Sequence, residues 1–193
     1  VSKTQGPEAV RAAFDAGQAA FGENYVQEAL DKIAALRALP LQWHLIGPLQ
    51  SNKTRPVAEA FDWVHSVDRL KIAERLADQR PEALPPLNLC LQVNVSGEAS
   101  KSGCDPAEAP ALARAIAALP ASRVRLRGLM AIPAPGGGAA PLRALRTLWE
   151  GLRDQGLALD TLSMGMSDDL EAAVAEGSTM VRIGTAIFGA RKP

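Results

Sequence analysis

Segments of strand character and segments of helical character alternate along the whole chain. Short apolar or alternating runs end at eight positions, and apolar residues at helical spacing lie between most successive runs. Eight such units are what a closed parallel barrel requires. We therefore expect an α/β fold of the (β/α)8 TIM-barrel type. The eight expected strand ends are Val1, Phe21, Ile46, Val67, Val95, Ile132, Met164 and Ile183.

The run Leu87–Val95 carries the strongest strand signal. Its nearly continuous apolar content is typical of a strand that is covered on both faces. The same alternation also describes a doubly wound open sheet. No G-x-G-x-x-G follows the first expected strand, so nothing favours a dinucleotide-binding fold. Eight units within 193 residues favour the closed barrel.

Length and composition indicate an ordinary globular protein. A chain of 193 residues with 47% apolar and 22% charged residues predicts a single domain spanning residues 1–193. Basic and acidic residues number 21 each, which gives no support for a nucleic-acid partner. No apolar run approaches the roughly 20 residues of a membrane helix. Cys90 and Cys104 have neither metal-ligand spacing nor a disulfide framework, so we expect a cytoplasmic protein. The sequence carries no signal of the oligomeric state, and a monomer is the default expectation.

Two glycine-containing turns follow the last two expected strands. The turn Gly165–Ser167 comes after the expected strand Thr161–Met164, and Gly184–Thr185 comes after Thr179–Ile183. Helix N-termini at such turns present free N–H groups, and the loops after the last two strands of a barrel commonly hold phosphate. Tight turns with a hydroxyl cap and no ligand would have the same sequence. Two adjacent turns favour the phosphate interpretation.

Four other side chains at expected strand ends are candidates for chemistry. Lys3 carries an amine that can attack a carbonyl to form an imine, although a surface lysine would look the same. Arg182 lies in the apolar run Met180–Ile183, where a buried unpaired charge is costly, so a pyridine nitrogen or a carboxylate is expected beside it. His44 and Asn24 either face a ligand or satisfy local hydrogen bonds.

Several short segments, in order over essentially the whole chain, together match one known family. They are Val1–Thr4, Phe21–Tyr25, Trp43–Gly47, Leu49–Lys53, Val93–Val95, Lys101–Gly103, Arg127–Met130, Ser163–Ser167 and Arg182–Gly184. With these segments the chain resembles the pyridoxal phosphate homeostasis proteins, which are single-domain barrels similar to the N-terminal barrel of alanine racemase. Members of that family carry a helix and the body of the first strand before the lysine, and we expect this chain to lack both.

The resemblance implies a pyridoxal 5′-phosphate (PLP) site. It implies that Lys3 forms a Schiff base with PLP and that Arg182 faces the pyridine nitrogen. The remaining implied contacts are phosphate ligands and wall residues of one site: Ser167, Gly184 and Thr185 for the phosphate, and Asn24, His44 and Met130 for the wall.

Three functions are compatible with such a site. The favoured one is a non-catalytic carrier that buffers PLP and supplies it to PLP-dependent apo-enzymes. The alternative is a PLP-dependent amino-acid racemase, which needs a second acid/base group, commonly a tyrosine from a partner domain. The only tyrosine of this chain is Tyr25. A sugar-phosphate enzyme ranks last, because it has no need for Lys3 beside Arg182.

Overall fold

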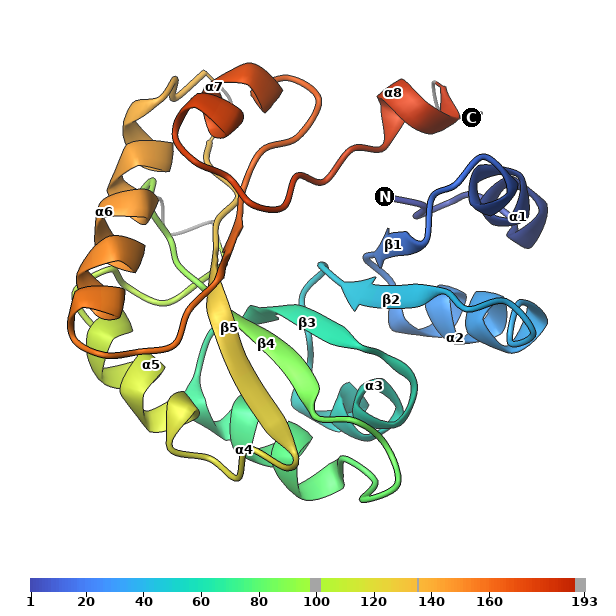
Figure 1. Cartoon of the computed structure of the whole chain (residues 1–193), viewed down its shortest axis with the longest axis horizontal. Helices are drawn as coiled ribbons and strands as arrows, with labels where there is room; N and C mark the ends of the chain where they lie inside the picture. Colours follow the sequence, from blue (N-terminus) through green and yellow to red (C-terminus); the bar gives the residue numbers. More distant parts are fainter. Residues whose placement is uncertain (98–101, 135, 190–193) are drawn as a thin grey trace.

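A computed structural model describes residues 1–97, 102–134 and 136–189 as a curved parallel sheet with helices on its outer side (Figure 1). Its six strands pair in chain order, each with the next. All pairs are parallel, so each connection returns through a helix. The strands are β1 (Ala20–Glu23), β2 (Gln42–Leu45), β3 (Trp63–Val67), β4 (Leu87–Gln92), β5 (Val124–Met130) and β6 (Thr161–Ser163).

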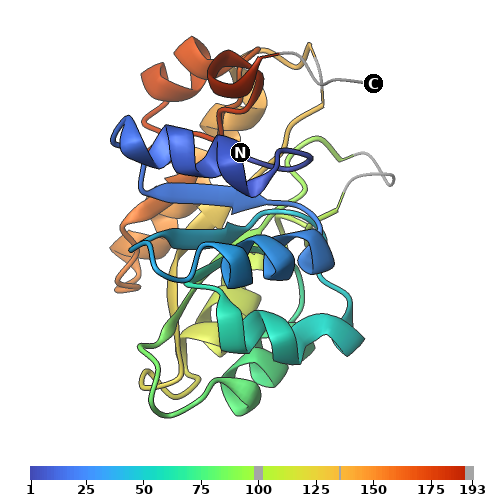
Figure 2. The same ribbon diagram turned by 90° about the vertical axis from the view of Figure 1, so that its right-hand side faces the viewer.

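The helices follow the strands in the expected alternation. Figure 2, turned so that the N-terminal half faces the viewer, shows the helices of this half covering their strands. Helices α1, α5 and α6 each carry a proline in the first turn, where its missing N–H costs nothing. The helices are α1 (Pro7–Asp15), α2 (Val26–Ala35), η1 (Ser51–Lys53), α3 (Thr54–Ala60), α4 (Leu70–Gln79), α5 (Ala109–Ala117), α6 (Ala140–Asp154), α7 (Leu170–Ala175) and α8 (Thr185–Phe188).

The core lies between the sheet and these helices. Every residue of β3 is buried, and so are five of the six residues of β4. Burial on both faces is the pattern that the apolar run Leu87–Val95 predicted. That run is shorter as a strand than expected, because beyond Gln92 its pairing is limited to a bridge between Val93 and Cys104.

The first and last expected strands are not strands in the described residues, which corrects the count of eight. Of the segment Thr179–Ile183, only Met180 bridges to Ser163. Val1 and Ser2 make one backbone hydrogen bond on each side, to Ile183 and to Gly22. A ladder needs repeated pairing, and these two segments make only isolated contacts. Hydrogen bonds nevertheless continue from β6 through these two segments back to β1, giving a TIM-barrel-like fold.

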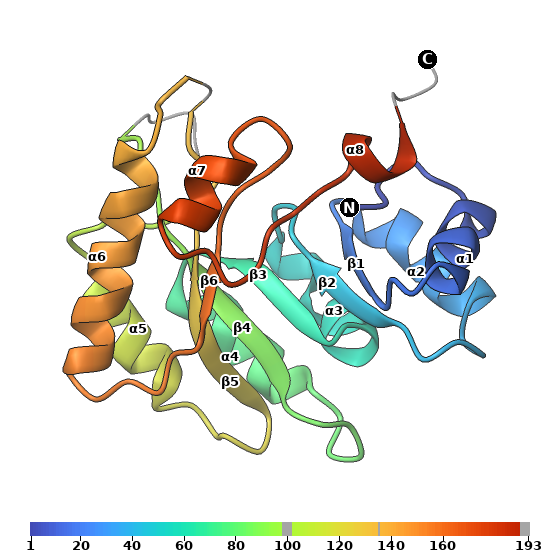
Figure 3. The ribbon, with the colours of Figure 1, turned by 45° about the horizontal axis from the view of Figure 1, so that its top comes forward.

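This closure brings the two ends of the chain together. Figure 3 shows α8 beside the N-terminal segment, and Figure 1 shows the same neighbourhood from another side. The helix α8 stands where the sequence predicted only a turn at Gly184–Thr185. Its first turn therefore faces the carboxyl ends of the strands, where barrels carry their functional sites.

Candidate functional site

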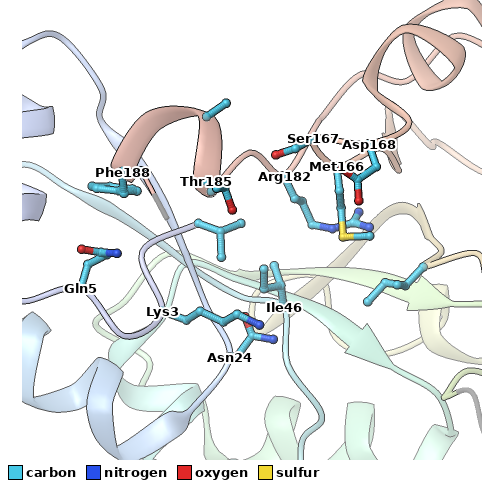
Figure 4. Close-up of a pocket in the computed structure, with 15 residues that line it drawn as sticks. Lys3, Gln5, Asn24, Ile46, Met166, Ser167, Asp168, Arg182, Thr185 and Phe188 are labelled. Carbon is cyan, nitrogen blue, oxygen red and sulfur yellow. The ribbon is translucent and has the colours of Figure 1, made fainter. Parts of the chain in front are cut away.

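A cleft of about 550 Å³ opens at the carboxyl ends of the strands. This volume is in the range of small-molecule sites. Figure 4 shows side chains of the N-terminal segment facing side chains from the loop before α7 and from α8. Six of the eight predicted site residues line it: Lys3, Asn24, Ser167, Arg182, Gly184 and Thr185.

A buried ionic clamp holds the segment that carries Lys3. The Lys32 ammonium, on α2, donates to the Ser2 carbonyl at 2.6 Å, to Glu28 Oε1 at 2.6 Å and to both carboxylate oxygens of Glu23 at 2.9 and 3.0 Å. The Ser2 hydroxyl donates to Glu23 Oε1 at 2.5 Å. Burial raises the pKa of the Glu23 carboxyl, and the hydrogen bonds from Ser2 and Lys32 partly offset this rise.

The residue after Lys3 has a strained backbone. Thr4 has φ +66°, a left-handed conformation that is unfavourable for a β-branched residue. Its N–H donates to Glu28 Oε1 at 2.6 Å, so the same carboxylate that binds Lys32 also holds this turn. The backbone on both sides of Lys3 is thus fixed to α2, while the Lys3 side chain extends along the cleft (Figure 4).

Arg182 is almost fully buried and is held by neutral acceptors. Its Nη1 donates to Ser163 Oγ and its Nη2 to the Ala131 carbonyl, both at 2.8 Å. Among the described residues no carboxylate forms an ion pair with it. Desolvation lowers the pKa of the Arg182 guanidinium to about 10, so the group stays charged at neutral pH. A guanidinium can only donate hydrogen bonds, and this one also lines the cleft.

The loop before α7 is shaped by one glycine and one aspartate. Gly165 has φ +96°, and a Cβ there would lie 2.5 Å from the Ala173 Cβ, so both conformation and space require glycine. The Met166 N–H donates to Asp169 Oδ1 at 2.6 Å, which places Ser167 at the edge of the cleft.

The first turn of α8 forms the neighbouring edge of the cleft. Gly184 precedes this helix and Thr185 begins it. The first N–H groups of any helix have no partner within that helix. Together with the hydroxyls of Thr185 and Ser167, they form a set of donors suited to an anion.

Asn24 lies where β1 ends and contributes an unsatisfied polar atom. Its Oδ1 is buried and has no hydrogen-bond partner among the described residues. The backbone just after β2 passes so close that a Cβ on Gly47 would lie 2.1 Å from the Asn24 carbonyl oxygen. A buried acceptor without a donor costs about 1–3 kcal/mol, so a ligand that donates here would be favoured.

Two predicted wall residues lie outside the cleft. His44 is buried beneath it and lines a second cavity of about 320 Å³, which Arg182 also borders. Met130 is fully buried in a cluster with Trp63 and Cys90. The predicted contact of these two side chains with PLP stays a prediction.

Sequence reasoning missed several residues that shape the site. Ser163 accepts a hydrogen bond from Arg182 and is itself hydrogen-bonded to His65. Glu23 and Lys32 hold the lysine segment. The sequence signal that could have identified them is the presence of polar residues within strands and on a buried helix face. A buried charged residue needs a partner, so such residues are expected to interact. Sequence alone does not identify that partner.

Two classes of feature are absent from the part of the chain that the structure describes. No group of three or more His, Cys, Asp or Glu side chains is arranged to hold a metal ion. None of the helices formed by these residues has the length and apolarity needed to cross a bilayer.

Comparison with known families identifies the family of this chain. Residues 1–192 match the family described as alanine racemase, N-terminal domain. The chain is 68% identical over 192 residues to the pyridoxal phosphate homeostasis protein of Pseudomonas aeruginosa, covering 99% of this chain and 83% of that protein. It is 59% identical over 198 residues to the protein of the same name from Escherichia coli K12, covering 99% and 84%.

Solved structures give the same result. PipY of Synechococcus elongatus PCC7942, in a structure with PLP bound, superposes with a TM-score of 0.89 at 46% identity, covering 97% of this chain and 90% of that one. An alanine racemase of Clostridium difficile shares the fold, with a TM-score of 0.79 at 11% identity, covering 96% of this chain and 49% of that one. With identities of 68% and 59% to proteins of that name over nearly its whole length, the chain belongs to the pyridoxal phosphate homeostasis protein family.

Proposed function

We propose that this protein binds PLP in the cleft through Lys3 and buffers the supply of the cofactor without catalytic turnover. The observation that carries the proposal is the meeting of Lys3, Arg182 and the two turns at residues 165–167 and 184–185 in one cleft. The names of the relatives and the PLP-bound PipY structure support the choice of ligand.

The side chains in the cleft fit the chemical groups of PLP. An amine suits an aldehyde, a guanidinium suits a pyridine nitrogen, and helix N–H groups with hydroxyls suit a phosphate dianion. Ser167, Gly184 and Thr185 are the proposed phosphate ligands. The unpaired Oδ1 of Asn24 offers an acceptor to a ligand donor.

Lys3 provides the reversible attachment. When bound, PLP supplies an aldehyde carbonyl, and the Lys3 amine condenses with it by forming a C=N bond and releasing one water molecule. Hydrolysis reverses the reaction, so the attachment is covalent and yet releasable. The clamp formed by Glu23, Glu28 and Lys32 keeps the backbone of the lysine in place while its side chain reacts.

Arg182 favours binding over catalysis. A guanidinium donates and never accepts, so it holds a facing pyridine nitrogen in its unprotonated state. An unprotonated ring is a weaker electron sink than the pyridinium that most PLP enzymes use. A weaker electron sink does not by itself exclude racemisation.

The racemase alternative depends on a second acid/base group. The only tyrosine in the sequence, Tyr25, is 56% exposed and does not line the cleft. Measurable loss of optical activity from L-alanine, abolished by Lys3→Ala, would overturn the carrier proposal in favour of racemase. We expect no such loss.

Borohydride trapping tests the attachment. Reduction of the PLP-loaded protein should leave a pyridoxyl group on the peptide that contains Lys3, detected by mass spectrometry. Lys3→Ala should abolish this adduct, whereas Lys71→Ala, at an exposed lysine of α4, should leave it intact. A loaded wild-type protein with no adduct on Lys3 would refute the assignment.

We also propose that the protein acts in the cytoplasm as a single-domain monomer and passes PLP to apo-enzymes. A releasable C=N bond suits transfer to the active-site lysine of a recipient. Light scattering should give the mass of one chain, and mixing with an apo-enzyme should restore that enzyme's activity. A stable dimer, or transfer no faster than spontaneous release into buffer, would contradict these two points.

A further inference from the structure

A continuous chain of hydrogen bonds runs through the interior of the barrel from Arg182 to Gln42. Arg182 Nη1 and Ser163 Oγ are 2.8 Å apart, and Ser163 Oγ and His65 Nδ1 are also 2.8 Å apart. His65 Nε2 and His44 Nδ1 are separated by 2.9 Å, and His44 Nε2 and Gln42 Oε1 by 3.0 Å. The chain thus starts at the cleft and ends at the first residue of β2.

With the oxygen of the Gln42 amide facing His44, the Gln42 end of this chain sets the direction of every bond, and the Arg182 end is compatible with it. Gln42 Oε1 only accepts, so the His44 Nε2 carries a hydrogen and its Nδ1 accepts. His65 must then donate from Nε2 and accept at Nδ1, where the Ser163 hydroxyl donates. The oxygen of Ser163 is left to accept from Arg182, which can only donate. In each hydrogen bond of the chain, one donor then faces one acceptor.

Burial and stacking hold the two imidazoles in this arrangement. His65 is 0% exposed and His44 is 4% exposed. The His44 ring stacks on Trp63 with centroids 5.3 Å apart and planes within 6°. Burial lowers the pKa of His44 to about 4 and that of His65 well below its ordinary value, so both rings are neutral at pH 7. A neutral His65 places no like charge near Arg182.

The chain matters for Arg182 because this side chain has few other anchors. Its guanidinium is held at two points, Ser163 Oγ on β6 and the Ala131 carbonyl just after β5. A hydroxyl that donates to one group becomes a better acceptor for another, so His65 strengthens the bond from Arg182 to Ser163. Without the hydroxyl, a long flexible side chain would pivot about its one remaining anchor.

We propose that Ser163, oriented by His65 and through it by His44, is the positioning residue that aims the Arg182 guanidinium into the cleft. This inference rests on the proposed PLP-binding function. The ligand group in question is a neutral ring nitrogen that accepts a hydrogen bond. Neither Ser163 nor His65 needs to touch the ligand.

A pair of serine variants tests the proposal. Ser163→Ala should weaken PLP binding about tenfold, because the donor to the ring is no longer aimed. It should also shift the visible absorption band of the bound cofactor. Ser66→Ala is the matched control: Ser66 is buried next to His65, and its hydroxyl has no hydrogen-bond partner among the described residues. This control should bind PLP as the wild type does.

A pair of histidine variants separates positioning from packing. His65→Asn keeps an acceptor for the Ser163 hydroxyl, whereas His65→Leu keeps bulk and loses the acceptor. The Asn variant should retain the wild-type absorption band and the Leu variant should not. Equal spectra for these two variants would overturn the role of His65.

The direction of the bonds can be measured on the unmodified protein without ligand. The chain contains two histidines, so imidazole ¹⁵N spectra are assigned with one variant. Both rings should carry their hydrogen on Nε2 at pH 7. A hydrogen on Nδ1 of His65 would refute the chain as described.

The outcomes distinguish this inference from the proposed function. A wild-type protein that forms the Lys3 adduct, together with Ser163→Ala and Ser66→Ala variants that bind PLP equally well, would refute the positioning role alone. A wild-type protein that neither binds PLP nor forms the adduct would refute the proposed function and the inference built on it.

Discussion

Replacing Lys32 by methionine should remove the ionic clamp that holds the segment carrying Lys3. The Lys32 ammonium donates its three hydrogens to the Ser2 carbonyl, to the Glu28 carboxylate and to the two carboxylate oxygens of Glu23, at 2.6 to 3.0 Å. Methionine keeps the length of the side chain and removes all of these bonds. The fully buried Glu23 carboxylate would then keep only the Ser2 hydroxyl as donor among these groups.

The expected cost is large because a buried charge loses its partner. Removing one member of a buried ion pair costs about 3–5 kcal/mol of unfolding free energy. The double variant Glu23→Gln/Lys32→Met also removes the orphaned charge, so it should be less destabilised than the sum of the single variants by about 1–3 kcal/mol. Lys71→Met, at an exposed lysine, should stay within about 0.5 kcal/mol of the wild type.

The pH dependence of this loss has a defined sign. Burial already raises the pKa of Glu23, and Lys32 lowers it, so the variant raises it further. Over the range between the unfolded and folded pKa values, the folded variant binds a proton that the unfolded chain does not. Its stability therefore falls as pH rises through that range. The deficit of Lys32→Met relative to wild type should be largest near pH 7 and should shrink toward pH 4.5.

Urea unfolding followed by circular dichroism at pH 7 and pH 5 measures these differences. Borohydride trapping of the same variant should give less Lys3 adduct, because the backbone beside Lys3 is no longer held. A Lys32→Met variant with wild-type stability at both pH values would refute the reasoning. So would a deficit that grows on acidification.

Three further predictions concern other parts of the site and core. Asn24→Ala should weaken PLP retention, measured by dialysis, without destabilising the ligand-free protein, because the lost Oδ1 has no described partner; a clear fall in Tm would contradict this. Gly165→Ala should lower Tm and weaken PLP binding, because the left-handed turn and the contact with Ala173 leave no room for a Cβ; an unchanged Tm would contradict it. Burial raises the pKa of Cys90 to about 12 and that of Cys104 to about 11, so at pH 8 neither thiol should react with a disulfide reagent until urea unfolds the chain; rapid reaction of the native protein would refute this.

The alternation of strands and helices was predictable because each element has its own periodicity. The run Leu87–Val95 predicted a strand covered on both faces, and β4 is such a strand. The segment Thr179–Ile183 was also expected to be a strand, but it forms only a bridge at Met180. Strand formation depends on pairing with the neighbouring chain, and here Ile183 accepts an isolated hydrogen bond from Val1. Local sequence carries no information about that partner.

The residues of the site likewise fall into those that the sequence could predict and those that it could not. Arg182 could be singled out because a charge in an apolar strand needs a partner. Lys3 was a candidate because of its place at an expected strand end, and the family resemblance supplied its role. The connection of Arg182 to Ser163 and His65 could not be predicted, because His65 and Ser163 are 98 positions apart and each looks like an ordinary polar residue in a strand. The family resemblance implied that His44 is a wall residue, and in the structure it lies in that hydrogen-bond chain between His65 and Gln42.

The closure of the barrel also links ligand binding to stability. Lys3 belongs to the first segment, whereas Ser167, Arg182 and Thr185 belong to the last quarter of the chain. Among the described residues, a backbone hydrogen bond from Val1 to Ile183 joins these two parts directly. On the proposed function, PLP contacts both parts and binds only where they are together. Its binding free energy then adds to the stability of the closed barrel, by about 2.7 kcal/mol when the free ligand is 100 times its Kd. Lys3→Ala should lose most of this ligand-induced gain in stability. Its ligand-free Tm should stay nearly unchanged, because the Lys3 side chain makes no hydrogen bond to any described residue.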